Sequence, residues 1–387
     1  MDLSYIINEL GEDREQYHRA VSPPIAQASN FAFDTIADIS NVFADEMSGY
    51  IYSRGLNPTV DILRKKLAAL DGAEESLVFN NGAAATYAGV MANVKAGDHI
   101  VSVRDPYSWT KKLFDTILPR YGVHTSYVDG GTIEEWMATT QPNTTFYYLE
   151  SPNSWTFAIQ PIQAITAYAK QKGIVTMIDN SYATPLYQPV ISMGIDLAMQ
   201  TATKYIGGHS DTLGGVLSGS KAMIKKIFDM DYLAIGSGMQ PFNAWLMLRS
   251  LRTMPVRLER ITRTTRTIAA FLKQQPQIES IVYPFDESFD QYELAASQMK
   301  PVGGLVTIIL QTRQREQIVQ FCERLQHFLI AVSWGGHESL VLPKCAGIPA
   351  EQFNPEDKWH RSVRLYFGLE EPDYLIRDLE QALRQLT

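Results

Sequence analysis

The sequence has few of the residues and patterns that mark secreted or membrane proteins. Only two of its 387 residues are cysteines, Cys322 and Cys345, and they do not form a CxxC motif. Two such cysteines cannot build a disulfide framework, so we expect both to be reduced thiols. No run of 18 apolar residues is present, so we expect no membrane-spanning helix.

The chain also lacks a secretion signal and a basic stripe. Acidic residues occur by position 9, and neither the basic nor the apolar part of a signal peptide precedes them. The 42 acidic residues outnumber the 34 basic ones, which form no dense cluster, so neither nucleic acid nor an anionic membrane is an expected partner. We therefore expect a cytoplasmic protein whose partners are small metabolites.

The spacings of common hydrolases are missing as well. The seven histidines show no HExxH motif or comparable ligand spacing, so we expect no metal site. His209, Ser210 and Asp211 are adjacent, whereas the members of a catalytic triad come from separate segments. The sequence therefore predicts neither a metallohydrolase nor a triad hydrolase.

What the sequence does contain is the pattern of a large α/β protein. An apolar content of 45% over this length is enough for a large core and more than one domain. Short apolar segments alternate with amphipathic ones, which predicts βα units and a mostly parallel central sheet covered on both faces. The predicted strands are 77–79, 99–103, 145–149, 174–178 and 197–200, and the predicted helices are 60–70 and 161–172.

The pattern changes along the chain and divides it into three predicted parts. Residues 1–60 are polar and weakly periodic, and we expect an N-terminal arm that packs on something else. Residues 61–246 carry the α/β pattern, and residues 247–387 predict a smaller α+β domain. Its predicted elements are a long helical stretch near the boundary (241–274), helices 313–326 and 373–386, and strands 280–283, 305–311 and 362–366.

The most informative segment is TATKYIGGHSD, residues 201–211, which follows a predicted buried strand. Most lysines lie on charged, solvated surfaces, but Lys204 is flanked by hydroxyl residues and glycines. An amine in this setting can form a Schiff base with a carbonyl cofactor, and the hydroxyls of Thr201 and Thr203 can bind phosphate oxygens. We therefore interpret Lys204 as the covalent anchor of a cofactor.

Two further segments fit a cofactor that has a ring nitrogen and a phosphate. Asp179 ends an apolar strand, where ligands bind in open α/β sheets, and an acid there can pair with a protonated pyridine nitrogen. An acid at this position would by itself more often be a helix N-cap. The interval from Asp179 to Lys204 leaves room for one further strand, and this spacing favours the cofactor-binding interpretation. The run that begins Gly82-Ala83 follows a strand and opens a helix, so its amides can bind a phosphate, although many such turns bind nothing.

These segments, in this order, resemble the Cys/Met-metabolism enzymes that depend on pyridoxal 5′-phosphate (PLP). The resemblance runs from about residue 50 to the C-terminus and includes YIYSRGLNPT (50–59) and SWGGHESL (333–340). It implies a PLP-dependent aminotransferase-like fold (fold type I), PLP as the cofactor, and cleavage of a carbon–sulfur bond in a sulfur amino acid. Freed from the cofactor, Lys204 would be the base that removes the Cα proton.

The resemblance also implies roles for single residues. Tyr52 and Arg54 would reach the cofactor phosphate of a neighbouring subunit, and Tyr52 would help to deprotonate the substrate amine. Tyr107 would stack on the cofactor ring, and Arg364 with Ser333 would hold the substrate α-carboxylate, which a guanidinium grips through two parallel hydrogen bonds. Because the sites would be shared, the expected assembly is at least a dimer and, by the family's arrangement, a homotetramer.

The motifs that separate members of the family point in two directions. Trp334, the GAAA at 82–85 and Ser154 in ESPNS resemble the cystathionine β-lyases, whereas the NPT at 57–59 and the ATP at 183–185 resemble γ-type enzymes; Trp155 fits neither pattern. We expect a cystathionine β-lyase, which forms homocysteine, pyruvate and ammonia, in methionine biosynthesis. The alternatives are cystathionine γ-synthase, cystathionine γ-lyase or methionine γ-lyase activity, and more remotely a PLP-binding regulator without catalysis.

Overall fold

The computed structural model describes residues 1–386, which form two compact units. The larger unit contains residues 1–151, 159–207 and 211–253. The smaller unit begins at residue 254 and also includes two short segments, 152–158 and 208–210. The predicted division at residues 60 and 246 stays a prediction, because compactness alone does not define a functional domain.

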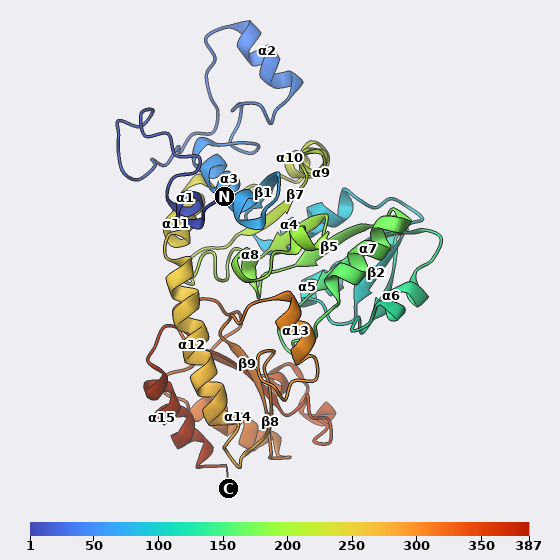
Figure 1. Cartoon of the computed structure of the whole chain (residues 1–387), viewed down its shortest axis with the longest axis vertical. Helices are drawn as coiled ribbons and strands as arrows, with labels where there is room; N and C mark the ends of the chain where they lie inside the picture. The colour runs from blue at the N-terminus through green and yellow to red at the C-terminus, as the bar shows by residue number, and fades with distance from the viewer. Residues whose placement is uncertain (387) are drawn as a thin grey trace. The chain divides into compact units, whose positions relative to one another are not determined.

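A seven-stranded sheet forms the centre of the larger unit (Figure 1). Its strands are β1 (Glu75–Phe79), β2 (His99–Val103), β3 (His124–Val128), β4 (Thr144–Glu150), β5 (Val175–Asp179), β6 (Leu197–Gln200) and β7 (Gly215–Gly219). They lie in the order β1-β7-β6-β5-β4-β2-β3. The pairs from β3 to β6 are parallel, and only the pairs that β7 makes are antiparallel. The predicted mostly parallel central sheet is confirmed.

Both faces of this sheet are buried. Successive residues of a strand point to opposite sides, so a single strand contributes to the core on each face. Phe146 and Tyr148 of β4 belong to the core on one face, whereas Tyr147 and Leu149 belong to the core on the other. The first core includes residues of α4 (Gly82–Met91) and α9 (Lys221–Ile227), and the second includes residues of α6 (Ile133–Thr139) and α7 (Ile162–Lys172). Burial on both faces explains why the strands are apolar runs rather than alternating ones.

The N-terminal segment packs in part on its own unit. In α1 (Leu3–Asn8), Ile6 and Ile7 are buried, and α1 contacts α3 (Pro58–Asp71). By contrast, α2 (Ile36–Ala44) has no buried residue and stands clear of the sheet in Figure 1. The remaining helices of the larger unit are α5 (Ser108–Lys112), α8 (Thr184–Tyr187), α10 (Leu233–Ile235) and α11 (Pro241–Leu251).

The smaller unit is built on a five-stranded sheet of order β10-β11-β12-β9-β8. Its strands are β8 (Ile278–Val282), β9 (Leu305–Leu310), β10 (Leu329–Ile330), β11 (Leu340–Pro343) and β12 (Ser362–Tyr366), and its helices are α12 (Met254–Leu272), α13 (Tyr292–Gln298), α14 (Arg315–Arg324) and α15 (Pro372–Leu383). Apolar residues of α12, α14 and α15 form one core with the sheet. All its strand pairs except β10–β11 are antiparallel, as an α+β domain requires.

The structure corrects one predicted element. The long helical stretch at 241–274 is two helices, α11 and α12, which are separated at Arg252 and Thr253. Pro255 explains the break, because proline has no backbone N–H to donate and is tolerated only in the first turn of a helix. A new helix therefore begins at Met254, just before this proline.

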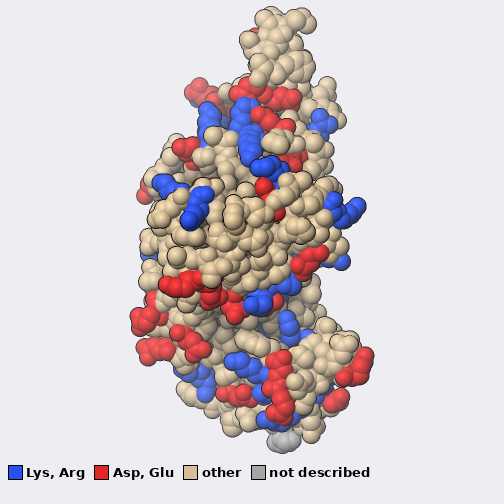
Figure 2. Space-filling model, turned by 90° about the vertical axis from the view of Figure 1, so that its right-hand side faces the viewer, with Lys and Arg blue, Asp and Glu red and all other residues tan. Residues whose placement is uncertain are grey.

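Figure 2 shows acidic and basic side chains interspersed over the face that it presents. Within residues 1–386, no helix combines the length and the apolar character needed to span a bilayer. The same residues contain no group of three or more His, Cys, Asp or Glu side chains that could hold a metal ion.

Candidate cofactor and substrate site

The predicted acid and hydroxyl residues of the larger unit meet at the carboxyl edge of its sheet. Asp179 is the last residue of β5, and Thr201 follows directly after β6, the parallel neighbour of β5. Ser181 links them, because its hydroxyl donates to Asp179 Oδ1 at 2.5 Å and accepts the Thr201 N–H at 2.7 Å. The loops after two neighbouring strands are thus fixed to each other.

Asp179 is a buried acid with only one oxygen engaged. Both bonds from Ser181, through its amide at 2.9 Å and its hydroxyl, reach Oδ1. No hydrogen bond to Oδ2 is found among the described residues. Burial raises the pKa of Asp179, while the bonds from Ser181 and the positive charge of Lys204 act against that rise. A cationic ring N–H at Oδ2 would stabilise this carboxylate in its ionised form.

The N-terminus of α4 provides hydrogen-bond donors for an anion. Asn81 caps the helix by accepting the Ala84 N–H at 2.8 Å, and no acceptor for the Gly82 and Ala83 amides is found in the part of the chain that is described. A Cβ atom added to Gly82 would overlap the Thr201 hydroxyl, so this hydroxyl lies against the helix end. Two amides, a hydroxyl and the helix dipole therefore converge, as phosphate binding requires.

The Thr203 hydroxyl has a partner within the chain, Gly214. Its hydroxyl accepts the Gly214 N–H at 3.1 Å and is 3.4 Å from the Gly214 carbonyl oxygen. These contacts close the loop that carries Lys204. The role of Thr203 as a phosphate ligand stays a prediction, and Thr201 is the hydroxyl that lies beside the helix end.

Lys204 and Tyr107 complete the group in the larger unit. The Lys204 amide donates to the Thr201 carbonyl at 3.1 Å in a turn, and its charge acts on Asp179. The Tyr107 amide donates to Glu150 Oε2 at 2.6 Å, at the end of β4. Burial, and then the negative charge of Asp179, raise the pKa of Tyr107, so its phenol is neutral at physiological pH. The Asp179 carboxylate thus interacts electrostatically with both side chains.

Tyr52 and Arg54 lie together, and neither forms a hydrogen bond or ion pair through its side chain with another described residue. The Arg54 guanidinium carbon is 5.6 Å from the centroid of the Tyr52 ring. The tyrosine is 49% exposed. The pair is therefore free to meet a group from outside its own chain.

In the smaller unit, Arg364 has no acidic partner among the residues that the structure describes. It lies on β12 and is 7% exposed, and its hydrogen bonds reach only the carbonyls of Ser154 at 3.4 Å and Ser333 at 3.3 Å. Burial lowers its pKa to about 10, which leaves it charged at neutral pH. Arg361 on the same segment is different, because it forms an ion pair with Glu279 at 2.5 Å. A substrate carboxylate would provide Arg364 with an anionic partner, as Glu279 does for Arg361.

The sequence prediction missed two residues of the larger unit's group, Ser181 and Glu150. Glu150 was detectable, because it is an acid at the end of a buried strand, the same signal that identified Asp179. It is the cross-strand partner of Asp179 between β4 and β5. No sequence pattern identifies Ser181, because its role depends on the hydrogen bond that its hydroxyl accepts from the Thr201 amide after β6.

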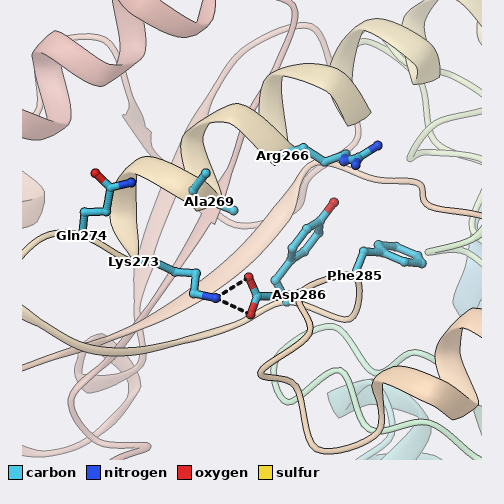
Figure 3. Close-up of a pocket in the computed structure, with 8 residues that line it drawn as sticks. Arg266, Ala269, Lys273, Gln274, Phe285 and Asp286 are labelled. Carbon is cyan, nitrogen blue, oxygen red and sulfur yellow. Dashed lines mark hydrogen bonds and ion pairs between the residues drawn. The ribbon is translucent and has the colours of Figure 1, made fainter.

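A cavity of about 480 Å³ lies elsewhere in the smaller unit, between α12 and the segment after β8 (Figure 3). Lys273 and Asp286 line it and form an ion pair, with the lysine Nζ 2.8 and 3.0 Å from the two carboxylate oxygens. Because these charges already compensate each other, they give no reason to place the functional site in this cavity.

The residues of the larger unit fit PLP in each of its parts. The end of α4 and Thr201 suit the phosphate, Asp179 suits the ring nitrogen, and Lys204 supplies an amine for the aldehyde. Fold and site together define a class of protein, the fold type I enzymes that carry PLP. The chain belongs, within that class, to the Cys/Met metabolism PLP-dependent enzyme family, whose model matches residues 5–384.

Individual relatives agree with this assignment. L-methionine gamma-lyase of Porphyromonas gingivalis is 34% identical over 95% of this chain and 93% of the relative. Cystathionine gamma-lyase of Bacillus subtilis is 32% identical, with 95% of each chain covered. The crystal structure of metB from Corynebacterium glutamicum superposes with a TM-score of 0.91 at 30% identity, covering 100% of this chain and 99% of that one. The predicted family, fold class, PLP cofactor and lyase activity in sulfur amino-acid metabolism are confirmed.

Proposed function

We propose that this enzyme cleaves a carbon–sulfur bond of cystathionine. The observation that carries the proposal is Arg364, a buried guanidinium that has no acidic partner among residues 1–386. The same chain has an amine, Lys204, whose charge acts on the buried acid Asp179. In the proposed reaction, Arg364 and Ser333 bind the substrate α-carboxylate. An amino acid with a sulfur leaving group is therefore held at its carboxyl end.

Lys204 has two proposed tasks in this reaction. Its amine would hold the cofactor by its aldehyde and, when not bound to the cofactor, would take the proton from Cα of the substrate. When bound, PLP supplies an electron sink for the resulting negative charge. Asp179 keeps the ring nitrogen protonated, Tyr107 covers the ring, and the group formed by Gly82, Ala83, Thr201 and Thr203 holds the phosphate.

We propose that the bond between Cγ and sulfur is the one that breaks. Support comes from the relatives named above as gamma-lyases and from the γ-type motifs NPT and ATP in this chain. Cystathionine would then give cysteine, 2-oxobutyrate and ammonia. Cleavage at Cβ, as a cystathionine β-lyase performs it, is the second candidate, because Trp334, the GAAA run and Ser154 favour it.

One experiment separates these reactions. The purified holoenzyme is incubated with L-cystathionine, and the keto acid is identified by mass spectrometry. We expect 2-oxobutyrate; pyruvate would establish the β-lyase activity instead. A protein that binds PLP yet releases neither keto acid from cystathionine or L-methionine would support the non-catalytic regulator.

We also propose that the active unit is at least a dimer and that two dimers form a tetramer. Supporting features are the free Tyr52–Arg54 pair and the exposed apolar residues Ile36 and Phe43 of α2, which are 82% and 62% exposed. The test mixes two inactive variants, Arg54→Ala and Lys204→Ala, after reversible dissociation. If Arg54 serves the partner's site, hybrid dimers regain one intact site, and activity rises to about a quarter of the wild-type value. No recovery, with hybrids shown to form, would contradict sharing.

A cytoplasmic location is part of the same proposal, and a role in methionine biosynthesis belongs to the second candidate, because only cleavage at Cβ releases homocysteine. Both cysteines are buried free thiols, which supports a reducing compartment. Cell fractionation tests the location, and growth of a deletion strain without methionine tests the role.

A further inference from the structure

Two cations lie over the ring of Trp155, in a segment that belongs to the smaller unit. The guanidinium carbon of Arg364 is 5.0 Å from the ring centroid, and the Nζ of Lys344 is 4.9 Å from it. Both distances are within the range of a cation–π interaction. Trp155 fits neither motif pattern of the family, so the resemblance assigns it no role.

The ring is the best-placed partner that Arg364 has. The two hydrogen bonds of this arginine, at 3.4 and 3.3 Å, are longer than the 2.7–3.2 Å of ordinary N–H···O bonds. No ion pair to Arg364 is found among residues 1–386. A guanidinium that is buried, weakly bonded and without an acid has little to fix its orientation except the face of a neighbouring aromatic ring.

Trp155 is itself held in place by the chain around it. Its amide donates to Asn153 Oδ1 at 2.9 Å, and its carbonyl accepts the Thr307 hydroxyl at 2.9 Å. Thr307 on β9 is the direct cross-strand partner of Arg364 on β12. The tryptophan backbone is thus attached to the strand that pairs with the one carrying the arginine.

We propose that Trp155 is a positioning residue, which holds the Arg364 guanidinium in the orientation that binds a substrate carboxylate. The inference rests on the proposed function, because it assumes that Arg364 binds the α-carboxylate. A guanidinium held against a ring face keeps its N–H edges free for two parallel bonds to a carboxylate. The ring therefore contributes to the selection of substrates with a free α-carboxylate over their amides.

The test compares two probes that differ only in that group. L-norleucine has the α-carboxylate but no sulfur leaving group, and L-norleucinamide carries an amide in its place. Binding to the holoenzyme is followed by the change in cofactor absorbance, in wild type, Trp155→Phe and Trp155→Leu. The matched control is Trp359→Leu, because Trp359 lies in the same unit and also has a lysine, Lys358, at 5.4 Å from its ring centroid.

We expect Trp155→Leu to raise the Kd of L-norleucine roughly tenfold to thirtyfold, the effect of a cation–π contact of about 1.4–2 kcal/mol. The Kd of L-norleucinamide should stay within about twofold, a limit set by ordinary surface substitutions. Trp155→Phe, which keeps an aromatic face, should lie between wild type and Trp155→Leu. With L-cystathionine, KM should rise in parallel while kcat changes little, because chemistry at Cα is untouched.

Several results would overturn the inference. An equal loss for both probes would show a merely structural role, and unchanged binding of L-norleucine in both Trp155 variants would show no role. If Trp155→Leu does not fold, the test uses Trp155→Phe alone. This variant must then bind L-norleucine more weakly than wild type does, with no matching loss of binding for L-norleucinamide. Failure of the proposed function looks different: wild type would then release no keto acid, yet would still bind L-norleucine more tightly than the amide. A wild type that does not discriminate between the probes removes both the Arg364 role and the Trp155 role.

Discussion

Two buried charged clusters of the larger unit differ in how far the chain itself supplies partners for their charges. In one, Lys66 Nζ lies 3.1 Å from Glu12 Oε1, and both side chains are fully buried. Arg252 Nη2 is also 3.1 Å from the same oxygen, and Lys66 donates to the Ile6 carbonyl. In the other, Asp179 receives hydrogen bonds on one oxygen only.

Structural and functional charges differ in where their compensation comes from. Every partner in the Glu12 cluster comes from the chain itself, so the cluster fastens the N-terminal segment to α3 and α11. Burial lowers the pKa of Lys66, and the charge of Glu12 opposes that shift. In the Asp179 cluster, compensation is incomplete without a ligand, which is the condition that a cofactor site requires.

The strongest test removes the amine from the incompletely compensated cluster. Lys204→Ala should abolish the absorbance of lysine-bound PLP and lower turnover by at least about a thousandfold, because the covalent anchor and the base are lost together. Absorbance spectroscopy and keto-acid release measure the two effects. Lys221→Ala, at an exposed lysine of the same unit, is the control and should retain both. Turnover near the wild-type level in Lys204→Ala would contradict the assignment.

The complementary test breaks the fully compensated cluster. Lys66→Met leaves Glu12 with two partly exposed cations, Arg14 and Arg252, but without its buried one, and should lower the free energy of unfolding by roughly 3–5 kcal/mol. Urea unfolding followed by circular dichroism measures the loss. Lys65→Met is the control, because Lys65 is half-exposed and its ion pair with Asp61 contributes little. Equal losses in the two variants would show that the buried cluster is no more important than a surface pair.

A third buried acid, Asp71, has only neutral partners and should respond to pH. Gln200 Nε2 donates to its Oδ1 at 2.6 Å, and burial raises its pKa from 3.8 to about 7. The unfolded chain therefore loses this proton at a lower pH than the folded chain does. Stability contributed by the protonated form falls as pH rises from about 4 to 7, and stays low above that.

Asp71→Asn removes this dependence by keeping a neutral group. At pH 8 the variant should be more stable than wild type by on the order of 2–4 kcal/mol, and near pH 4 the difference should vanish. Urea unfolding at both pH values measures it. A constant difference at the two values would show that Asp71 does not titrate between them.

The smallest expected effect concerns the ion pair in the cavity of Figure 3. Lys273 is 42% exposed in its side chain and pairs with Asp286, so Lys273→Met should change the unfolding free energy by no more than about 0.5 kcal/mol. Thermal unfolding measures it. A loss as large as that of Lys66→Met would mean that solvent exposure does not separate the two kinds of charge.

Much of the fold was predictable because the strands of the larger unit are buried on both faces. β2 and β6 were predicted with their observed bounds, because each is a short segment of mostly apolar residues. β3 was missed because it is a polar edge strand, and β7 because it carries glycines. At Gly215 and Gly219 an added Cβ would overlap the backbone of Asn81 or Asp196, so close packing removed the apolar signal.

Candidate site residues could be predicted only where they lie on regular elements. Asp179 and Gly82 were predicted from their positions at the end of a strand and the start of a helix, and the structure has them at these positions. The partner of Thr203 and the linking role of Ser181 depend on how loops return to the sheet, which local sequence does not encode. The contact of Trp155 with Arg364 joins segments far apart in the chain, so only the folded structure places them together.

The smaller unit cannot be separated from the rest of the gene product as one piece. Residues 152–158 are synthesised long before residue 254, yet they supply Ser154 and Trp155 to the arginine on β12. A fragment that starts at Met254 would lack the Ser154 and Trp155 contacts of Arg364. Exchanging C-terminal parts between relatives would therefore mismatch the arginine and its tryptophan unless both segments were transferred together.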